Sequence, residues 1–162
     1  MNRKNKLFPL LHHLFYIHMA QQELNFKSIK ALNEMGKGNM VQHLGIEFIE
    51  FGQDYLTAKM PVDHRTHQPY GILHGGASVV LAETLGSVAA HGKIDVNKQM
   101  CVGQEINANH IKSVRSGYVF GKATPIHIGR NSHVWEIRIT TEDNELVCIS
   151  RITMAVLDRK DK

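Results

Sequence analysis

The stretch of sequence that most constrains the fold is 77–90, fourteen residues with a single ionisable side chain. It is longer than an ordinary strand, and its alanines and leucines favour a helix. Because such a helix is apolar on nearly every face, we expect it to be buried on nearly every face. The exception within it is Glu83. An unpaired buried carboxylate costs several kcal/mol, so a specific role must offset the cost of keeping it there.

The rest of the chain predicts one more helix and six strands. Apolar residues recur at helical spacing over 23–35, which predicts an amphipathic helix. Strands are predicted at 43–52, 54–62, 99–113, 117–128, 132–140 and 145–157. Short turns between the last four predict a meander of neighbouring strands. An α+β fold, in which a curved antiparallel sheet wraps around the apolar helix, accommodates this order, and its open edges favour pairing with a second copy.

The size and composition of the chain predict one globular domain, at 23–158, among its 162 residues. A net charge of +4 suits a small anionic ligand better than nucleic acid, since no basic run is interleaved with aromatic residues. Cys101 and Cys148 lie in separate apolar stretches, which favours free thiols, a reducing compartment and therefore the cytoplasm. No apolar segment is long enough to cross a membrane, so no membrane partner is expected.

Residues 1–22 contain a basic start and a short apolar run, which imitate a signal peptide. His12 and His13 interrupt the run, and no clear cleavage site follows it. We therefore favour a poorly ordered N-terminal extension over a secretion signal, and Met19 is a possible alternative start.

Two explanations are open for Glu83. It could form a structural ion pair with Lys112 or Arg115, or it could act as a base or nucleophile in catalysis. Ser87 lies four residues further along and therefore on the same helical face, where its hydroxyl can bind Glu83 or a water beside it.

The start of the same helix offers a second chemical feature. His74, Gly75 and Gly76 place backbone N–H groups at the positive end of the helix dipole, where a developing oxyanion would be stabilised. A plain tight turn with a loop histidine is the alternative. Gly75 and Glu83 are eight residues apart, or ~12 Å along a helix. One helix cannot bring both to the same carbonyl group, so a shared reaction requires a twofold dimer with antiparallel helices.

Longer motifs carry a family resemblance. The segment QPYGILHGGASVVLAETLGS, followed by EINANH and a strand-rich tail, resembles the hotdog-fold acyl-CoA thioesterases of the phenylacetate and 4-hydroxybenzoyl-CoA type. Over about residues 28–157 the chain looks most like the bacterial 1,4-dihydroxy-2-naphthoyl-CoA hydrolases of menaquinone-type pathways. The resemblance implies a hotdog fold, hydrolysis of an acyl-CoA to acid and CoA, and dimers or dimers of dimers with active sites shared between subunits.

The resemblance also implies roles for single residues. Glu83 matches the family's catalytic carboxylate, which acts as nucleophile or as general base on water. Gly75 matches the backbone donor to the thioester carbonyl, and Gln68 a side-chain donor near the same group. His74 matches a residue that helps to hold the thioester, and Ser87 the hydroxyl that helps to position the hydrolytic water.

A second set matches the family's contacts with coenzyme A. His110, Lys112 and Ser113 fall where the nucleotide and pantetheine are bound, and Gly76 and Arg115 are further candidates. The family often has arginine in place of Lys112, and lysine keeps the charge but loses the bidentate fork for phosphate. For Arg115, a solvated turn arginine is an equal alternative.

No cofactor or metal is expected, because the chain has no HExxH motif and no Cys/His spacing typical of zinc sites. Three alternative functions are open. The chain could be a broad-specificity medium-chain or phenylacetyl-type thioesterase, or a hydratase, although a hydratase would need a histidine opposite the carboxylate and His74 is at the glycine turn. It could also be a non-catalytic acyl-CoA-binding protein.

Overall fold

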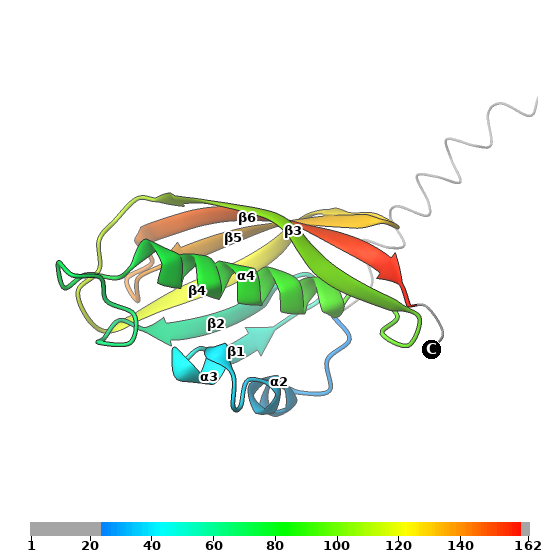
Figure 1. Cartoon of the computed structure of the whole chain (residues 1–162), viewed down its shortest axis with the longest axis horizontal. Coiled ribbons are helices and arrows are strands. Elements are labelled where there is room, and N and C mark those ends of the chain that lie inside the picture. Colours follow the sequence, from blue (N-terminus) through cyan, green and yellow to red (C-terminus); the bar gives the residue numbers. More distant parts are fainter. Residues whose placement is uncertain (1–23, 160–162) are drawn as a thin grey trace, which may run out of the picture.

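The computed structural model describes residues 24–159, so the expected extension at 1–22 lies outside the described residues. A long helix, α4 (Gly75–His91), lies across one face of a curved antiparallel sheet (Figure 1). This architecture confirms the predicted α+β class and the hotdog arrangement of sheet and helix. The helix is two residues longer at its start than predicted, because Gly75 and Gly76 form its first turn.

The sheet contains six described strands in the order β1-β2-β4-β5-β6-β3, and all neighbours are antiparallel. The strands are β1 (Glu47–Phe51), β2 (Leu56–Pro61), β3 (Gln99–His110), β4 (Tyr118–Ile128), β5 (Ser132–Thr140) and β6 (Leu146–Asp158). The predicted hairpin and the four later strands are therefore confirmed, apart from small differences at their ends.

The prediction of a four-stranded meander is wrong. Only β4, β5 and β6 follow one another in the sheet, whereas β3 pairs with β6 along its whole length. The connection 111–117 crosses the end of the sheet instead of making a tight turn. It is held there because Ile111 N–H donates to the Val147 carbonyl and Leu73 N–H donates to the Val114 carbonyl. Because the chain leaves the sheet edge at this crossing, β3 ends at His110 and does not reach residue 113 as predicted.

The first helix is shorter than predicted. Helix α2 spans Ile29–Met35, because the hydroxyl of Ser28 accepts the N–H of Ala31 and caps the helix there. The preceding residues are apolar for another reason: Leu24 is buried, and the Phe26 ring packs edge-on against Phe51. A second short helix, α3 (Met40–His43), was not predicted.

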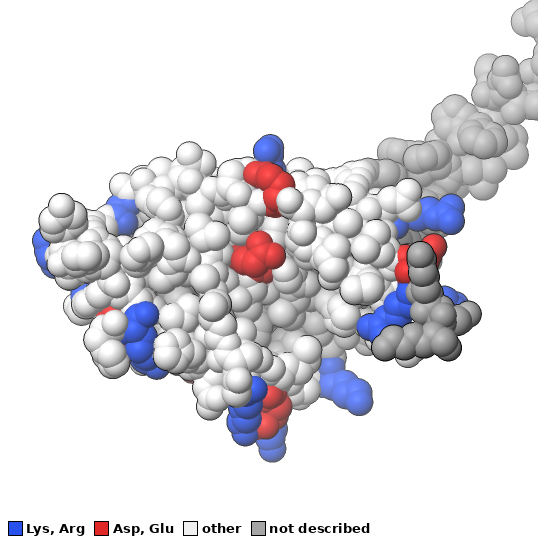
Figure 2. Space-filling model, viewed as in Figure 1, with Lys and Arg blue, Asp and Glu red and all other residues white. Residues whose placement is uncertain are grey.

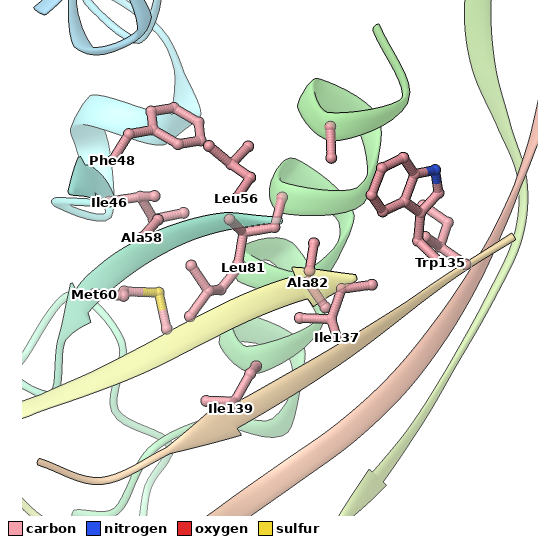
Figure 3. Close-up of a cluster of buried hydrophobic side chains, with 14 of the residues drawn as sticks. Ile46, Phe48, Leu56, Ala58, Met60, Leu81, Ala82, Trp135, Ile137 and Ile139 are labelled. Carbon is pink, nitrogen blue, oxygen red and sulfur yellow. The ribbon is translucent and has the colours of Figure 1, made fainter. Parts of the chain in front are cut away.

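The core lies between α4 and the concave face of the sheet (Figure 3). Trp135, Ile137 and Ile139 alternate along β5 and all face the helix, as a half-buried strand requires. Helix and sheet approach closely at Gly86, where a Cβ atom would lie 2.4 Å from a methyl carbon of Ile152. This close packing fixes the position of α4 on the sheet.

The two edges of the sheet differ. At the β1 edge, the side-chain amide of Asn33 donates to the Phe48 carbonyl at 3.0 Å, and its oxygen accepts the Phe48 N–H at 2.8 Å. Asn33 thus satisfies outward backbone groups that would otherwise attract another strand. The opposite edge is β3, where Met100 and Val102 are 40% and 37% exposed. The described chain therefore has one capped edge and one open edge.

Candidate active site

The first turn of α4 presents an unused backbone donor. His74 is the N-cap, and its Nδ1 accepts the N–H of Gly76 at 2.8 Å. This bond fixes Nδ1 as an acceptor, so the N–H of the neutral ring is on Nε2. Among the described residues, no carbonyl or side chain accepts the N–H of Gly75. The helix terminus therefore has a free donor at Gly75, whereas the donor of Gly76 is already engaged.

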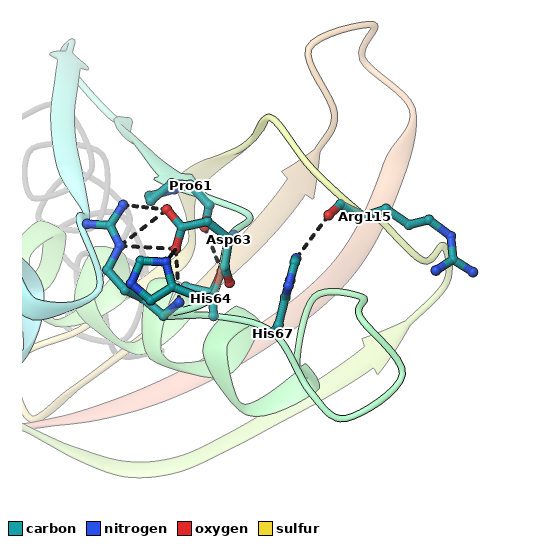
Figure 4. Close-up of polar contacts among 7 residues, drawn as sticks. Pro61, Asp63, His64, His67 and Arg115 are labelled. Carbon is teal, nitrogen blue, oxygen red and sulfur yellow. Dashed lines mark hydrogen bonds and ion pairs between the residues drawn. The ribbon is translucent and has the colours of Figure 1, made fainter.

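Polar contacts hold the loop before the helix in place (Figure 4). Arg65 makes a bidentate pair with Asp63, with Nη2 at 2.6 Å from Oδ2, and these hydrogen bonds hold the pKa of Asp63 well below its usual range. Thr66 is buried, and its hydroxyl donates to the Pro61 carbonyl. His67 Nε2 donates to the carbonyl of Arg115 at 2.9 Å, which ties the loop to the crossing connection.

Gln68 lies in this loop with one half of its amide engaged. Its Oε1 accepts the N–H of Tyr70 at 2.7 Å. The Nε2 hydrogens are then the groups that Gln68 can offer to another molecule. This orientation is the one that a donor to a carbonyl oxygen requires.

A pocket of about 280 Å³ lies between the loop, the helix start and the connection after β3. It gathers five of the predicted residues, Gln68, Gly75, His110, Lys112 and Ser113. Apolar walls come from Ile72, Leu73 and Val147. A pocket with a few convergent polar groups and apolar walls is typical of small-molecule sites.

The coenzyme-contact candidates lie in different surroundings. The ring of His110 lies against Gly75, where a Cβ atom would approach Nε2 to 2.7 Å. Lys112 forms an ion pair with Glu145, both about half exposed. Arg115 does not line the pocket, and its guanidinium points away from the loop into solvent (Figure 4). The structure thus brings His110 and Lys112 to the pocket but leaves Arg115 outside it.

Glu83 and Ser87 lie elsewhere on the helix. Ser87 Oγ donates to Glu83 Oε1 at 3.2 Å, as their four-residue spacing predicted. Glu83 is half-buried, so the prediction of a helix buried on nearly every face is wrong for the single chain. One side of α4 packs on the sheet. Its other side forms part of a largely uncharged molecular surface, which has two small acidic patches near its middle (Figure 2). Neither Glu83 nor Ser87 lines the pocket.

One chain therefore carries two separate sets of chemical groups. The pocket at the helix start contains the free N–H of Gly75 and the amide of Gln68, and the carboxylate of Glu83 lies eight residues further along α4. A thiol nucleophile is disfavoured, because burial raises the pKa of the Cys101 thiol to about 11. No group of three His, Cys, Asp or Glu side chains in the described part of the chain could hold a metal ion.

Two residues near these sets were not identified from the sequence. Gly103 on β3 faces the carboxylate of Glu83, and Thr66 anchors the loop. A glycine inside a strand pattern is a recognisable sign of a bulge or a close approach, so Gly103 could have been found. Thr66 could not, because its role depends on a turn that local sequence does not specify. Within residues 24–159, no helix has the length and apolar character needed to span a bilayer.

Comparison with known proteins places the chain in a family. A model of the thioesterase superfamily matches residues 70–148. The chain is 53% identical to the 1,4-dihydroxy-2-naphthoyl-CoA hydrolase of Escherichia coli, with 80% of this chain and 95% of that protein covered. It is 50% identical to the proofreading thioesterase EntH of Cronobacter turicensis, with 80% and 94% covered.

Solved structures agree with these sequence matches. A thioesterase of Haemophilus influenzae superimposes with a TM-score of 0.81 at 49% identity, and covers 84% of this chain and 94% of its own. A mutant thioesterase of Pseudomonas aeruginosa gives 0.82 at 49% identity, with 83% and 97% covered. The chain belongs to the thioesterase superfamily of hotdog-fold proteins.

Proposed function

We propose that this thioesterase hydrolyses an aromatic acyl-CoA to the free acid and coenzyme A, with 1,4-dihydroxy-2-naphthoyl-CoA as its substrate. The main observation in support is the free N–H of Gly75. It lies at a helix N-terminus, and Gly75 lines a pocket together with Gln68. Such donors stabilise the oxyanion of a tetrahedral intermediate. The identity to the Escherichia coli hydrolase supports the choice of acyl group.

In the proposed reaction, the thioester carbonyl oxygen accepts hydrogen bonds from Gly75 and Gln68, and His74 Nε2 lies beside the same group. Glu83 takes a proton from water, and the water oxygen bonds to the carbonyl carbon. The C–S bond then breaks, and the proton on Glu83 passes to the departing thiolate. Direct attack by the carboxylate, followed by hydrolysis of the resulting anhydride, is the alternative route. Ser87 orients the carboxylate in both routes.

The site is completed by a second subunit. The pocket and Glu83 of one chain are separated by about 12 Å along α4, too far for one carbonyl group to touch both. We propose a twofold dimer in which the α4 helices run antiparallel, so that Glu83 of each chain reaches the pocket of the other. The open β3 edge and the capped β1 edge support pairing through β3. Two such dimers would form a tetramer.

His110, Lys112 and Ser113 lie at the pocket and are proposed to contact coenzyme A. For Lys112 this contact would exchange a Glu145 carboxylate for a phosphate, at little cost because the pair is exposed. Gly76 is proposed to allow close approach of the ligand, and Arg115 to meet the nucleotide at its periphery. We place the enzyme in the cytoplasm, since Cys101 and Cys148 are both free thiols.

Thiol release from a panel of CoA thioesters tests this proposal. The panel contains 1,4-dihydroxy-2-naphthoyl-, benzoyl-, phenylacetyl- and medium-chain acyl-CoA, and crotonyl-CoA as a substrate for hydration. Glu83→Gln and Glu83→Ala are expected to lower kcat about 10²–10⁴-fold, because the base is lost. Glu34→Gln, which removes an exposed carboxylate on α2, serves as the matched control.

Three results would contradict the proposal. Wild-type rates in both Glu83 variants would remove the catalytic assignment. Hydration of crotonyl-CoA without thiol release would favour a hydratase, and tight binding without thiol release would favour a non-catalytic protein. A preference for phenylacetyl- or medium-chain acyl-CoA would keep the reaction and change the acyl group.

A further inference from the structure

Gly103 on strand β3 lies directly against the carboxylate of Glu83. A Cβ atom built on Gly103 would be 2.7 Å from Glu83 Oε1 and 3.6 Å from its Cδ. The shorter distance is well inside ordinary van der Waals contact. The carboxylate therefore occupies the space that any side chain at position 103 would need.

The backbone of β3 is irregular at the same place. Gly103 pairs with Met154 and Glu105 pairs with Thr153, so Gln104 is an extra residue with no partner in the register. A bulge of this kind bends a strand locally, and bulges are frequent beside active sites. Here the bulge directly follows the glycine that faces Glu83.

The two carboxylate oxygens of Glu83 have different surroundings. Oε1 accepts the hydroxyl of Ser87 and lies next to Gly103. Oε2 is further from that position, at 3.8 Å from the Cβ site. One oxygen is thus held between helix and strand, which directs the other away from β3.

We propose that Gly103 is a positioning residue for Glu83 in thioester hydrolysis. It lets Oε1 lie against β3, where Ser87 holds it, so that Oε2 is the oxygen that takes the proton from water or attacks the thioester. This inference rests on the proposed catalytic role of Glu83. In this proposal Gly103 acts on the reaction only through the position of the Glu83 carboxylate, so its effect is expected in kcat and not in KM.

A double-mutant cycle tests the proposal on benzoyl-CoA. Gly103→Ala is expected to lower kcat about 10²-fold, because a methyl group displaces the carboxylate by roughly 1 Å. Glu83→Asp also lowers kcat, since the shorter side chain withdraws its oxygens from β3. The double variant is expected to match Glu83→Asp alone within about two-fold, because the withdrawn carboxylate no longer meets the methyl group. KM should change less than about two-fold in all three.

Two outcomes would overturn the role of Gly103. One is wild-type kcat in Gly103→Ala. The other is a double variant that loses the product of the two single effects, which would also be seen if Gly103→Ala disturbed folding or assembly. Glu83→Gln separates this failure from that of the proposed function. If Glu83→Gln is inactive, only the proposed role of Gly103 is wrong. If Glu83→Gln is fully active, the catalytic assignment of Glu83 is itself wrong.

Discussion

At the scale of single residues, the proposed site depends on glycines, which leave room for other side chains beside the main chain. The ring of His110 packs on the backbone of Gly75, and the carboxylate of Glu83 packs on Gly103. In both cases a glycine allows a side chain with a proposed role to touch main chain. The N–H of Gly75 remains available because His74 caps the next residue instead.

The contribution of the Gly75 N–H can be isolated with two substitutions. Gly75→Ala keeps the N–H and adds a methyl group against His110, whereas Gly75→Pro adds bulk at the same place and also removes the N–H. Proline is tolerated at the first helical position, and the extended backbone of His74 (φ −71, ψ 130) suits a residue before proline. We expect kcat of the proline variant to lie about 10²–10³-fold below that of the alanine variant.

Steady-state kinetics on benzoyl-CoA measures the difference, and circular dichroism checks that α4 persists. The alanine variant is the control for crowding of His110, whose displacement should raise KM in both variants. Equal kcat values for alanine and proline would mean that the Gly75 N–H does not stabilise the oxyanion.

His133 makes stability depend on pH. The residue is 1% exposed, and burial, with His127 and Lys93 nearby, lowers its pKa to about 4 from the usual 6.5. In the unfolded chain the His133 ring therefore gains a proton as the pH falls below about 6.5, whereas in the folded chain it stays neutral until about pH 4. Above about pH 6.5 the ring is neutral in both states, so its low pKa does not affect stability. As the pH falls from 6.5 toward 4, protonation of the unfolded chain progressively lowers the free energy of unfolding. At about pH 5 the expected loss is about 2 kcal/mol.

Urea unfolding at about pH 7 and about pH 5 measures this loss. In His133→Gln the fall in the free energy of unfolding between these values should be smaller than in the wild type. His64→Gln, at a histidine whose side chain is 89% exposed, is the matched control and should keep the wild-type fall. If the free energy of unfolding fell as much in His133→Gln as in the wild type, another titrating group would be responsible for the loss of stability.

At the scale of elements, most strands could be predicted because their sequences alternate and because turn residues separate them. The position of β3 in the sheet could not be predicted, because alternation identifies a strand but not its neighbour. The crossing at 111–117 also depends on contacts with segments that are distant in the sequence. The candidate residues around Gly75 were predictable, because a glycine pair before an apolar helix is a local feature. The ion pair of Lys112 with Glu145 was not, since the two residues are 33 apart in sequence.

The capped edge of the sheet gives a prediction at this scale. Asn33→Ala removes both hydrogen bonds to Phe48 and should lower the free energy of unfolding by about 1–3 kcal/mol. It also leaves the β1 edge open to other strands, so light scattering should detect more aggregation than in the wild type. Glu34→Gln changes the next residue and removes only an exposed ion pair, so it should stay within about 0.5 kcal/mol of the wild type. Equal stability of the two variants would contradict the capping role of Asn33.

At the scale of the whole molecule, the two halves of the proposed site lie on different parts of one helix. The antiparallel dimer proposed for this chain gives two equivalent sites, each with the pocket of one subunit and Glu83 of the other. It also covers the largely uncharged face beside α4 (Figure 2). A monomer with full activity would be incompatible with this arrangement.

Mixed dimers test the shared site most directly. Glu83→Gln and Gly75→Pro are each expected to be inactive, because one lacks the base and the other lacks the oxyanion donor. When the two are co-expressed with different tags, each mixed dimer has one site with both residues intact and one site with neither. Random pairing should therefore restore about a quarter of the wild-type rate of thiol release, and purified mixed dimers about half. If mixed dimers remain as inactive as their parents, each site is contained within one chain, and the shared-site account is wrong.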